Sequence, residues 1–371
     1  MKIALVYDRV NKFGGAERIL LALHQIWPDA PLFTAVYNQK KAPWAKVFPE
    51  IIPSFLNSFP AAKSHHELYP LFTPIAFETF DFSDYDIVIS TTSEAAKGII
   101  SKPSTLHISY ILTPTRYLWT GYSLYKKNPG FGPLNNLASF FFSATAKYLQ
   151  KWDIIASNRP DFLLAISQNV QKRILKYYHR PASVVYPPVD TDFFRPDPSK
   201  KDGNFFLIVS RLVPYKNIDI AIEAFRNINY PLTIIGTGTQ EKFYRQNLSP
   251  NISMLAGLTD GQLLSYYQSC TALIFASDED LGLVPIEAQS CGKPVIAYKR
   301  GGVLETVIEG KTGAFYDKNS PDDLKKAVES FQAYKYSEKD CRQNAQKFSK
   351  KRFKQEFQKK INEIYDNYQN Q

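Results

Sequence analysis

Cysteine is scarce in this sequence of 371 residues, and its scarcity excludes several classes of protein. The three cysteines, Cys270, Cys291 and Cys341, all fall in the C-terminal half, and none stands in a Cys-x-x-Cys pair or at a ligand spacing from a histidine. Neither a disulfide framework nor a structural zinc site is therefore indicated. The lack of a disulfide framework favours a reducing compartment, where thiols stay reduced.

Long hydrophobic runs are also missing. No stretch approaches the roughly 20 apolar residues that a membrane-spanning helix needs. Residues 1–7 lack the basic region and the long apolar segment of a signal peptide. We therefore expect a cytoplasmic protein, either soluble or attached peripherally to the inner face of the cell membrane. The 44% of hydrophobic residues is enough for a large core, which excludes a disordered chain, and the length predicts two domains.

Positive charge is concentrated in one half of the chain. Residues 1–180 hold 20 Lys and Arg against 12 Asp and Glu, so this half carries +8 of the total net charge of +10. Such a surface suits an anionic membrane or a phosphorylated substrate, and it is also compatible with mere solubilisation. A nucleic-acid partner is not expected, because the basic residues are scattered and accompany no known nucleic-acid-binding motif.

Short apolar runs alternate with segments of helical periodicity along the chain, which predicts repeated βα units and an α/β fold. In the first half we expect buried parallel strands at residues 2–7, 85–90, 107–112, 162–167 and 183–186. In the second half we expect them at residues 205–210, 231–235, 252–256, 272–276 and 294–298. Two facing Rossmann-like domains are the natural result.

The paired prolines Pro187 and Pro188 indicate the boundary between these domains, because proline interrupts helices and central strands. We predict a first domain over residues 1–187 and a second over residues 188–347. The remaining residues, 348–371, show apolar side chains at helical spacing, and we expect this helix to pack back on the first domain.

The most informative segment is residues 277–292, which follow the apolar run at 272–276. We place Pro285 at the first position of a helix and Glu287 in its first turn, with Glu279 in the preceding loop. A helix N-terminus presents unpaired N–H groups and a positive dipole end, so the backbone of Gly282, Leu283 and Val284 is a candidate anion site. Glu287 is equally compatible with simple pairing to the helix dipole.

Glu279 and Glu287 have the spacing of the Glu-x7-Glu signature of retaining glycosyltransferases of family 4, and the segment between them is especially similar to bacterial surface-polysaccharide mannosyltransferases. The resemblance extends over nearly the whole chain, in blocks that follow the family's order. These blocks are residues 14–17, 113–119, 186–190, 210–217, 236–238 and 279–305. The resemblance implies the GT-B fold, with the active site in the cleft between the two domains.

The resemblance also implies roles for individual residues. Arg211 and Lys216 would neutralise the donor diphosphate, and Glu279 would bind hydroxyls of the transferred sugar, so these three are the candidate catalytic residues. Glu287 would hold the ribose. The other candidate donor-binding residues are Gly14, Gly15, Gly236, Gly238, Gly282, Leu283 and Val284. A tight turn would also explain the glycines.

The implied reaction is transfer of a sugar from a nucleotide-sugar, with GDP-mannose the favoured donor, to a glycan or lipid-linked acceptor in surface polysaccharide or glycolipid synthesis. The nucleotide-sugar is a co-substrate, and we expect neither a cofactor nor a metal. Asp84 and Asp86 have the spacing of a D-x-D metal motif, but they precede an apolar strand and suggest a surface turn. Retention of anomeric configuration follows from the resemblance.

One residue departs from the family pattern. The related mannosyltransferases usually have a histidine before the Thr-Pro-x-Arg-Tyr block, and this sequence has Leu112 there. His107 is no obvious replacement, because five residues along a strand place it on the opposite face. Either an oxygen of the donor phosphate acts as the base, or the acceptor differs, or activity has been lost. A nucleotide-sugar-binding protein without activity is therefore one alternative. A sugar epimerase is a second, because the same fold could also support that enzyme.

The acceptor side is assigned to the basic half. Arg116 and Tyr117 follow a predicted strand and are candidate acceptor-binding residues, although packing of aromatic side chains under a loop is an equally good explanation. Residues 140–142 are three phenylalanines, and Lys147, Lys151 and Trp152 follow them on the same predicted helix. Core packing is favoured for this helix, with contact to an anionic membrane as the alternative.

Overall fold

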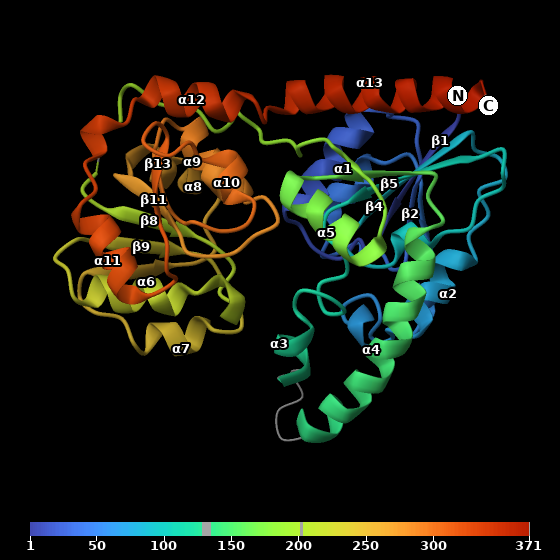
Figure 1. Cartoon of the computed structure of the whole chain (residues 1–371), viewed down its shortest axis with the longest axis horizontal. Coiled ribbons are helices and arrows are strands. Elements are labelled where there is room, and N and C mark those ends of the chain that lie inside the picture. The colour runs from blue at the N-terminus through green and yellow to red at the C-terminus, as the bar shows by residue number, and fades with distance from the viewer. Residues whose placement is uncertain (128–134, 201–202, 371) are drawn as a thin grey trace. The chain divides into compact units, whose positions relative to one another are not determined.

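The computed structural model describes residues 1–127, 135–200 and 203–370, and the chain divides into two compact units (Figure 1). Unit 1 comprises Met1–Tyr186 together with Lys354–Gln371, and unit 2 comprises Pro187–Phe353. Each unit is a parallel β-sheet with helices on its faces, as the alternation of apolar runs and helical segments predicted.

Unit 1 contains, within the described residues, a seven-stranded sheet of order β3-β2-β1-β4-β5-β6-β7. All its pairings are parallel, and its central strands β1, β4 and β5 are buried along their whole length because helices cover both faces. The strands are β1 (Ile3–Tyr7), β2 (Leu32–Thr34), β3 (Ile51–Pro53), β4 (Ile87–Thr92), β5 (Leu106–Ile111), β6 (Phe162–Ala165) and β7 (Ser183–Val184). The sequence had not predicted β2 and β3, which are only three residues long and show no clear period.

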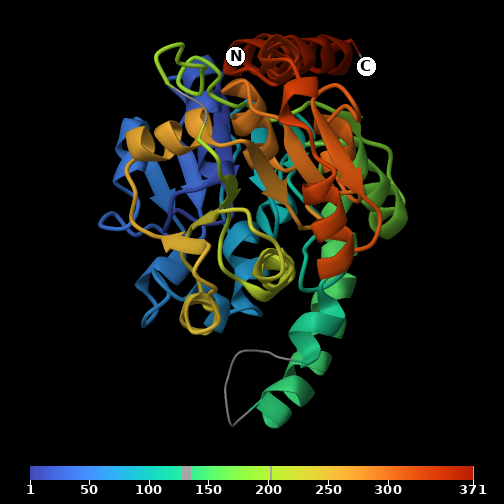
Figure 2. The same ribbon diagram turned by 90° about the vertical axis from the view of Figure 1, so that its left-hand side faces the viewer.

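The helices of unit 1 follow the strands as crossover connections. They are α1 (Gly15–Ile26), α2 (Phe72–Glu78), α3 (Tyr122–Lys127), α4 (Asn135–Ser157) and α5 (Gln168–Tyr178), with the short 3₁₀ helices η1 (Pro43–Val47), η2 (Phe55–Ser58), η3 (His66–Leu68) and η4 (Ala96–Gly98). Alternate strand residues, such as Val6 and Val88, pack with Phe77 of α2 into one apolar cluster. Figures 1 and 2 show that the first part of α4 projects away from this sheet.

Unit 2 contains, in the part of it that the structure describes, a six-stranded parallel sheet of order β10-β9-β8-β11-β12-β13. The strands are β8 (Phe206–Val209), β9 (Leu232–Ile235), β10 (Ile252–Leu255), β11 (Ala272–Phe275), β12 (Val295–Tyr298) and β13 (Gly313–Tyr316). The last of these, β13, was not predicted. It contains glycine and is only partly buried, so its hydrophobic pattern is weak.

The helices of unit 2 are α6 (Ile218–Arg226), α7 (Glu241–Arg245), α8 (Asp260–Ser269), α9 (Leu283–Ser290), α10 (Val303–Thr306), α11 (Pro321–Glu329) and α12 (Glu338–Gln346), with the 3₁₀ helices η6 (Pro214–Lys216) and η7 (Ala333–Lys335). Phe225 of α6 and Leu324 of α11 belong to the main apolar cluster together with Phe206 and Ile274 of the sheet. Helices α6 and α11 therefore cover the same face (Figure 1).

The C-terminal helix α13 (Lys350–Gln369) begins in unit 2 and ends on unit 1. At its start, the Lys350 ammonium lies 3.1 Å from the Asp190 carboxylate. Further along, the Phe357 ring packs edge-on against Trp27 and Tyr110 of unit 1, at centroid distances of 6.1 and 5.2 Å. Its buried residues Phe353, Phe357, Ile361 and Ile364 follow the helical spacing that predicted this helix.

Among the residues described, no helix has both the length and the apolar character required to cross a membrane.

Candidate functional site

The strand order of each sheet identifies the edge where a ligand can bind. In an open parallel sheet, ligands lie beyond the carboxyl ends of the strands, at the point where the strand order reverses. In unit 2 this point lies between β8 and β11, and in unit 1 it lies between β1 and β4. Most of the residues singled out in the sequence follow these strands or their neighbours.

Lys216 and Glu279 form an ion pair at the switch point of unit 2. Lys216 ends η6, in the loop after β8, and Glu279 lies in the loop after β11. Their side chains are 13% and 16% exposed, so a ligand can reach them without unfolding the loops. Two of the three predicted catalytic residues are thus in direct contact.

Arg211, the third predicted catalytic residue, is held beside this pair by Tyr215. Its guanidinium donates to the Tyr215 hydroxyl, and its centre lies 5.9 Å from the centroid of the Tyr215 ring. Lys216 Nζ lies 5.5 Å from the same centroid. Sequence reasoning missed Tyr215, although its position between the two basic residues in one loop was the available signal.

The loop of Gly236 and Gly238 lies directly against the loop that carries Arg211. Leu212 N–H donates to the Thr237 carbonyl at 2.8 Å. A Cβ on Gly236, whose φ is +157°, would lie 1.8 Å from the Ser210 carbonyl oxygen, and one on Gly238 would lie 2.3 Å from that of Leu212. Both glycines are therefore required by close backbone contact within unit 2, whatever they contribute to a ligand.

The N-terminus of α9 completes this edge. Gly282 precedes the helix with φ +87°, a left-handed conformation that suits glycine, and Leu283 and Val284 are its first two residues. Our prediction that Pro285 begins the helix was wrong, because the turn at Gly282 allows the helix to start at Leu283. Glu287 is consequently the fifth helical residue and lies beyond the first turn, where pairing with the helix dipole is weaker.

Glu287 is only 7% exposed, and its Oε2 atom accepts a hydrogen bond from the Tyr267 hydroxyl at 2.7 Å. Tyr267 itself is fully buried, on α8. This hydrogen bond therefore holds the Glu287 carboxylate of α9 in one orientation. Tyr267 is a second residue that sequence reasoning did not identify, since a tyrosine in a helix carries no specific signal.

In unit 1, Gly14 and Gly15 form the start of α1, which follows β1. The φ of Gly14 is −174°, an extended conformation open to any residue, and the nearest atom to an added Cβ is a Glu17 carboxylate oxygen at 3.3 Å. Glu17 is buried and accepts a hydrogen bond from the Tyr7 hydroxyl at 2.7 Å. The backbone conformation thus gives no reason for glycine at position 14.

Arg116 and Tyr117 lie in the loop after β5, next to a buried polar network. Asp153 of α4 accepts hydrogen bonds from Thr115 Oγ1 at 2.8 Å and Trp119 Nε1 at 2.7 Å, on either side of the two candidates. The Tyr117 ring packs against the cluster of Leu118, Ala146 and Leu149. Tyr117 therefore has the packing role that the sequence left open, whereas Arg116 is half-buried in the same loop.

Leu112 directly follows β5 and is 9% exposed. His107, at the other end of β5, is completely buried, and its Nε2 atom lies 2.9 Å from Ser90 Oγ. Burial, with the charges of Arg180 and Arg159, lowers the pKa of His107 to about 3. This histidine is neutral and enclosed, so it does not replace the histidine expected at position 112.

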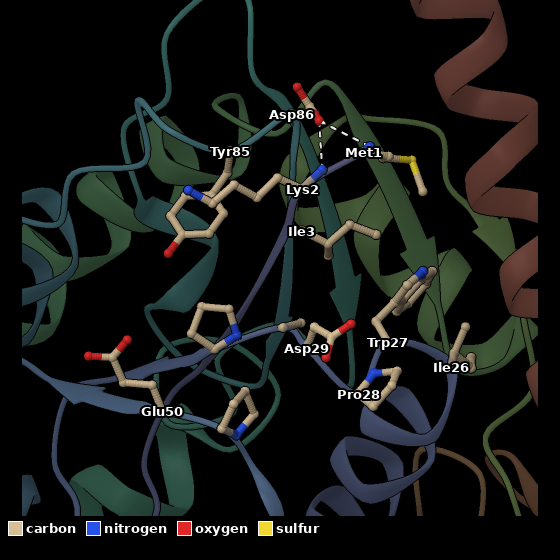
Figure 3. A pocket seen from close by; sticks show the side chains of 13 residues that line it. Met1, Lys2, Ile3, Ile26, Trp27, Pro28, Asp29, Glu50, Tyr85 and Asp86 are labelled. Atoms are coloured by element: carbon tan, nitrogen blue, oxygen red, sulfur yellow. Dashed lines mark hydrogen bonds and ion pairs between the residues drawn. The ribbon is translucent and has the colours of Figure 1, made fainter.

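A pocket lies at the opposite edge of the unit 1 sheet (Figure 3). It has a volume of about 710 Å³ and is lined by the amino ends of β1 and β4, together with Trp27 and Glu50. Asp86, from the predicted Asp84-x-Asp86 turn, lies there and accepts a hydrogen bond from the Lys2 N–H at 2.6 Å. This edge is not the one where Rossmann-like sheets bind their ligands.

Within the described residues, no group of three or more His, Cys, Asp or Glu side chains could hold a metal ion. None of the three cysteines, all of which are described and buried, forms a disulfide.

In the aromatic run at residues 140–142, the structure describes only the side chain of Phe142, which stacks on Tyr122 of α3. The side chains of residues 140 and 141 lie outside the description.

Comparison with known proteins shows which proteins this chain resembles. Residues 189–348 match the family model of the glycosyl transferases group 1. An uncharacterized glycosyltransferase of Methanocaldococcus jannaschii is 30% identical over 214 residues, which cover 56% of this chain and 59% of that protein. A GDP-mannose-dependent alpha-(1-6)-phosphatidylinositol monomannoside mannosyltransferase of Mycolicibacterium smegmatis is 29% identical over 203 residues, 46% of this chain and 53% of the relative. The match thus spans little more than half the length of these relatives.

Solved structures resemble the chain over almost its whole length. The Anabaena protein HepE, solved in complex with UDP and glucose, has a TM-score of 0.70 at 20% identity, covering 98% of this chain and 99% of its own. Sucrose-phosphate synthase from Thermosynechococcus elongatus has a TM-score of 0.75 at 14% identity, with coverage of 99% and 100%. At these identities the likeness establishes the fold. The chain therefore has the GT-B fold of two Rossmann-like domains, and its residues 189–348 are similar to the glycosyl transferases group 1.

Proposed function

We propose that this protein is a retaining, metal-independent glycosyltransferase that moves a sugar, with mannose favoured, from a nucleotide-sugar to a glycan or lipid-linked acceptor. The observation that carries the proposal is the convergence of Arg211, Lys216 and Glu279 with the N-terminus of α9 at the switch point of unit 2. The match of residues 189–348 to a glycosyl transferase family supports it.

The arrangement suits a sugar diphosphate. The cations of Lys216 and Arg211 would stabilise the negative charge that develops on the diphosphate as it leaves. The N–H groups at the start of α9 would stabilise the same charge. Glu279, paired with Lys216, would bind hydroxyls of the transferred sugar, and Glu287, oriented by Tyr267, would bind the ribose.

In the reaction, the bond between the anomeric carbon and the phosphate oxygen breaks and a bond from that carbon to the acceptor oxygen forms. The anomeric carbon passes through an oxocarbenium-like state. The proton of the acceptor hydroxyl leaves with the nucleoside diphosphate, whose phosphate oxygen would accept it, since Leu112 cannot. This pathway retains the anomeric configuration.

GDP-mannose is the favoured donor because the Mycolicibacterium relative is GDP-mannose-dependent. The structurally similar HepE was solved with UDP and glucose, so the base must be tested directly. Two alternatives are not favoured, because the relatives are named as glycosyltransferases or mannosyltransferases. They are a binding protein without activity, which Leu112 suggests, and an epimerase on the same fold.

The deciding experiment is a calorimetric titration of the protein with excess EDTA against GDP, UDP, GDP-mannose, UDP-glucose and UDP-N-acetylglucosamine. We expect binding of one nucleotide series and its loss in Glu287→Ala. The matched control is Glu329→Ala, which removes a half-exposed carboxylate at the end of α11. Equal affinities in wild type and Glu287→Ala would remove the assignment of the donor site.

We also propose that unit 1 contacts an anionic membrane at the cytoplasmic face. The exposed residues Lys147, Tyr148, Lys151 and Ile155 recur at helical spacing on α4, so they form a basic and apolar strip on that helix. The net charge of +8 in residues 1–180 would also attract an anionic membrane. Lack of binding to anionic vesicles at low salt, where electrostatic attraction is strongest, would refute this contact.

A further inference from the structure

The switch point of unit 1 contains a polar cluster that the sequence did not reveal. It is built by two consecutive residues, Asp8 and Arg9, which directly follow β1. Asp8 is 2% exposed, and its Oδ1 atom accepts hydrogen bonds from Thr92 Oγ1 at 2.8 Å and from the Ala96 N–H at 2.9 Å. Its Oδ2 atom accepts from the Ser93 N–H at 2.7 Å. The carboxylate therefore determines the shape of the loop after β4.

This loop presents Glu94 to Arg9. Arg9 Nη1 donates to Glu94 Oε1 at 2.5 Å, and His66 Nε2 lies 3.6 Å from Glu94 Oε2. Burial by itself would raise the pKa of Glu94, but the Arg9 charge and the His66 contact outweigh it and hold this pKa below its usual range. Glu94 is thus an ionised carboxylate in a fixed position.

The side chains of the cluster are partly exposed to solvent. The side chain of Glu94 is 22% exposed, and those of Arg9 and His66 are 15% and 13% exposed. By contrast, the structural pair of Lys97 and Asp153 in the same unit is 2% and 1% exposed. Tyr117, which packs in the loop after β5, is close enough for the charge of Glu94 to add to the effect of burial in raising the tyrosine pKa.

We propose that Glu94, held by Arg9, binds a hydroxyl of the sugar acceptor, a glycan, at the carboxyl edge of unit 1. This rests on the proposed function and names the residue that receives its second substrate. An ionised carboxylate accepts charge-assisted hydrogen bonds, and a lowered pKa makes it a weak base, so Glu94 orients the hydroxyl while the donor phosphate takes the proton. Arg9 acts through Glu94 and is a positioning residue.

The test uses octyl α-mannopyranoside as the acceptor probe and GDP-mannose as the donor, with wild type, Glu94→Gln, Glu94→Asp, Arg9→Lys and Glu50→Gln. Glu50→Gln is the matched control, because it neutralises an exposed carboxylate at the opposite edge of the same sheet. Probe binding is measured by saturation-transfer NMR and donor binding by calorimetry. Transfer is measured as formation of the product. Hydrolysis of the donor in the absence of acceptor is measured as release of GDP.

We expect Glu94→Gln to weaken probe binding and to raise the KM for the probe by roughly tenfold or more, the effect of losing a hydrogen bond to a charged group. GDP affinity and GDP release into water should stay within about twofold of wild type. Arg9→Lys should raise this KM with little change in kcat. If Glu94→Gln does not fold, Glu94→Asp decides, since it keeps the charge but withdraws it by one methylene.

Unchanged probe binding and KM in the folded Glu94 variants would overturn the inference, and so would a wild-type protein that does not bind the probe. Failure of the proposed function gives a different result, namely that wild type neither binds any nucleotide nor releases GDP. In that case the NMR comparison decides alone: a signal lost in Glu94→Gln and kept in Glu50→Gln supports the site, and equal signals overturn it.

Discussion

Lys97 Nζ lies 2.6 Å from Asp153 Oδ1, and both side chains are almost completely buried. Lys97 is in η4, after β4, whereas Asp153 is on α4, so the pair joins two elements that are far apart in the sequence. Asp153 also accepts hydrogen bonds from Thr115, Trp119 and Tyr178. The pair therefore anchors the loop that carries Arg116 and Tyr117.

Removing one partner of this pair should be costly. We predict that Lys97→Met lowers the free energy of unfolding by about 3–5 kcal/mol, because the Asp153 carboxylate would remain buried without its cation. Urea denaturation would measure the loss, with Lys151→Met as the control, since Lys151 is an exposed lysine on the same helix as Asp153. Similar stabilities of the two variants would contradict an anchoring role.

Lys216 is expected to act mainly on the rate. We predict that Lys216→Ala reduces kcat by about 10²- to 10³-fold, the range for removing one group that stabilises developing charge. Donor affinity should change less. Steady-state kinetics would show this, with Lys242→Ala, an exposed lysine of α7, as the comparison. An unchanged kcat would remove Lys216 from the candidate catalytic residues.

A methyl group at Gly238 should disturb the loops that carry the donor site. Gly238→Ala would place Cβ 2.3 Å from the Leu212 carbonyl oxygen, so the backbone must move, and we predict a lower melting temperature together with weaker nucleotide binding. Gly261→Ala is the matched control, because Gly261 lies in α8 with no atom within 4 Å of the added Cβ. That variant should be as stable as wild type or up to about 1 kcal/mol more stable.

Acid should destabilise the protein partly through His107. The pKa of this histidine is about 3 when folded, because of burial, and near 6.5 when unfolded. Between these values the unfolded chain binds a proton that the folded chain does not. The contribution of His107 to the free energy of unfolding is therefore complete above pH 6.5. It falls by about 1.4 kcal/mol for each pH unit below that value.

Chemical denaturation of wild type and His107→Gln between pH 7 and pH 4.5 would measure this contribution. Gln at position 107 does not titrate, so we expect the variant to lose less stability than wild type as the pH falls. Identical slopes would show that His107 binds its proton in the folded state.

The sequence was sufficient to predict the two βα series. The run at residues 272–276 is apolar throughout, because a parallel strand covered on both faces buries every side chain, and this pattern needs no knowledge of distant residues. The glycines and carboxylates after these strands were equally visible. Strands β2, β3 and β13 were missed because short or partly exposed strands lack that pattern.

Only the tertiary structure could decide which side chains meet. The pairing of Lys216 with Glu279, the orientation of Glu287 by Tyr267 and the contact of Arg9 with Glu94 all join residues that are 20 to 85 positions apart. Such contacts depend on strand order and on loop conformation, such as the early start of α9 after Gly282, and neither leaves a local pattern in the sequence. The sequence by itself thus determined most of the strands and helices and predicted the edge of each sheet where a ligand would bind. The folding of distant segments onto one another determined which charges are paired, buried or exposed.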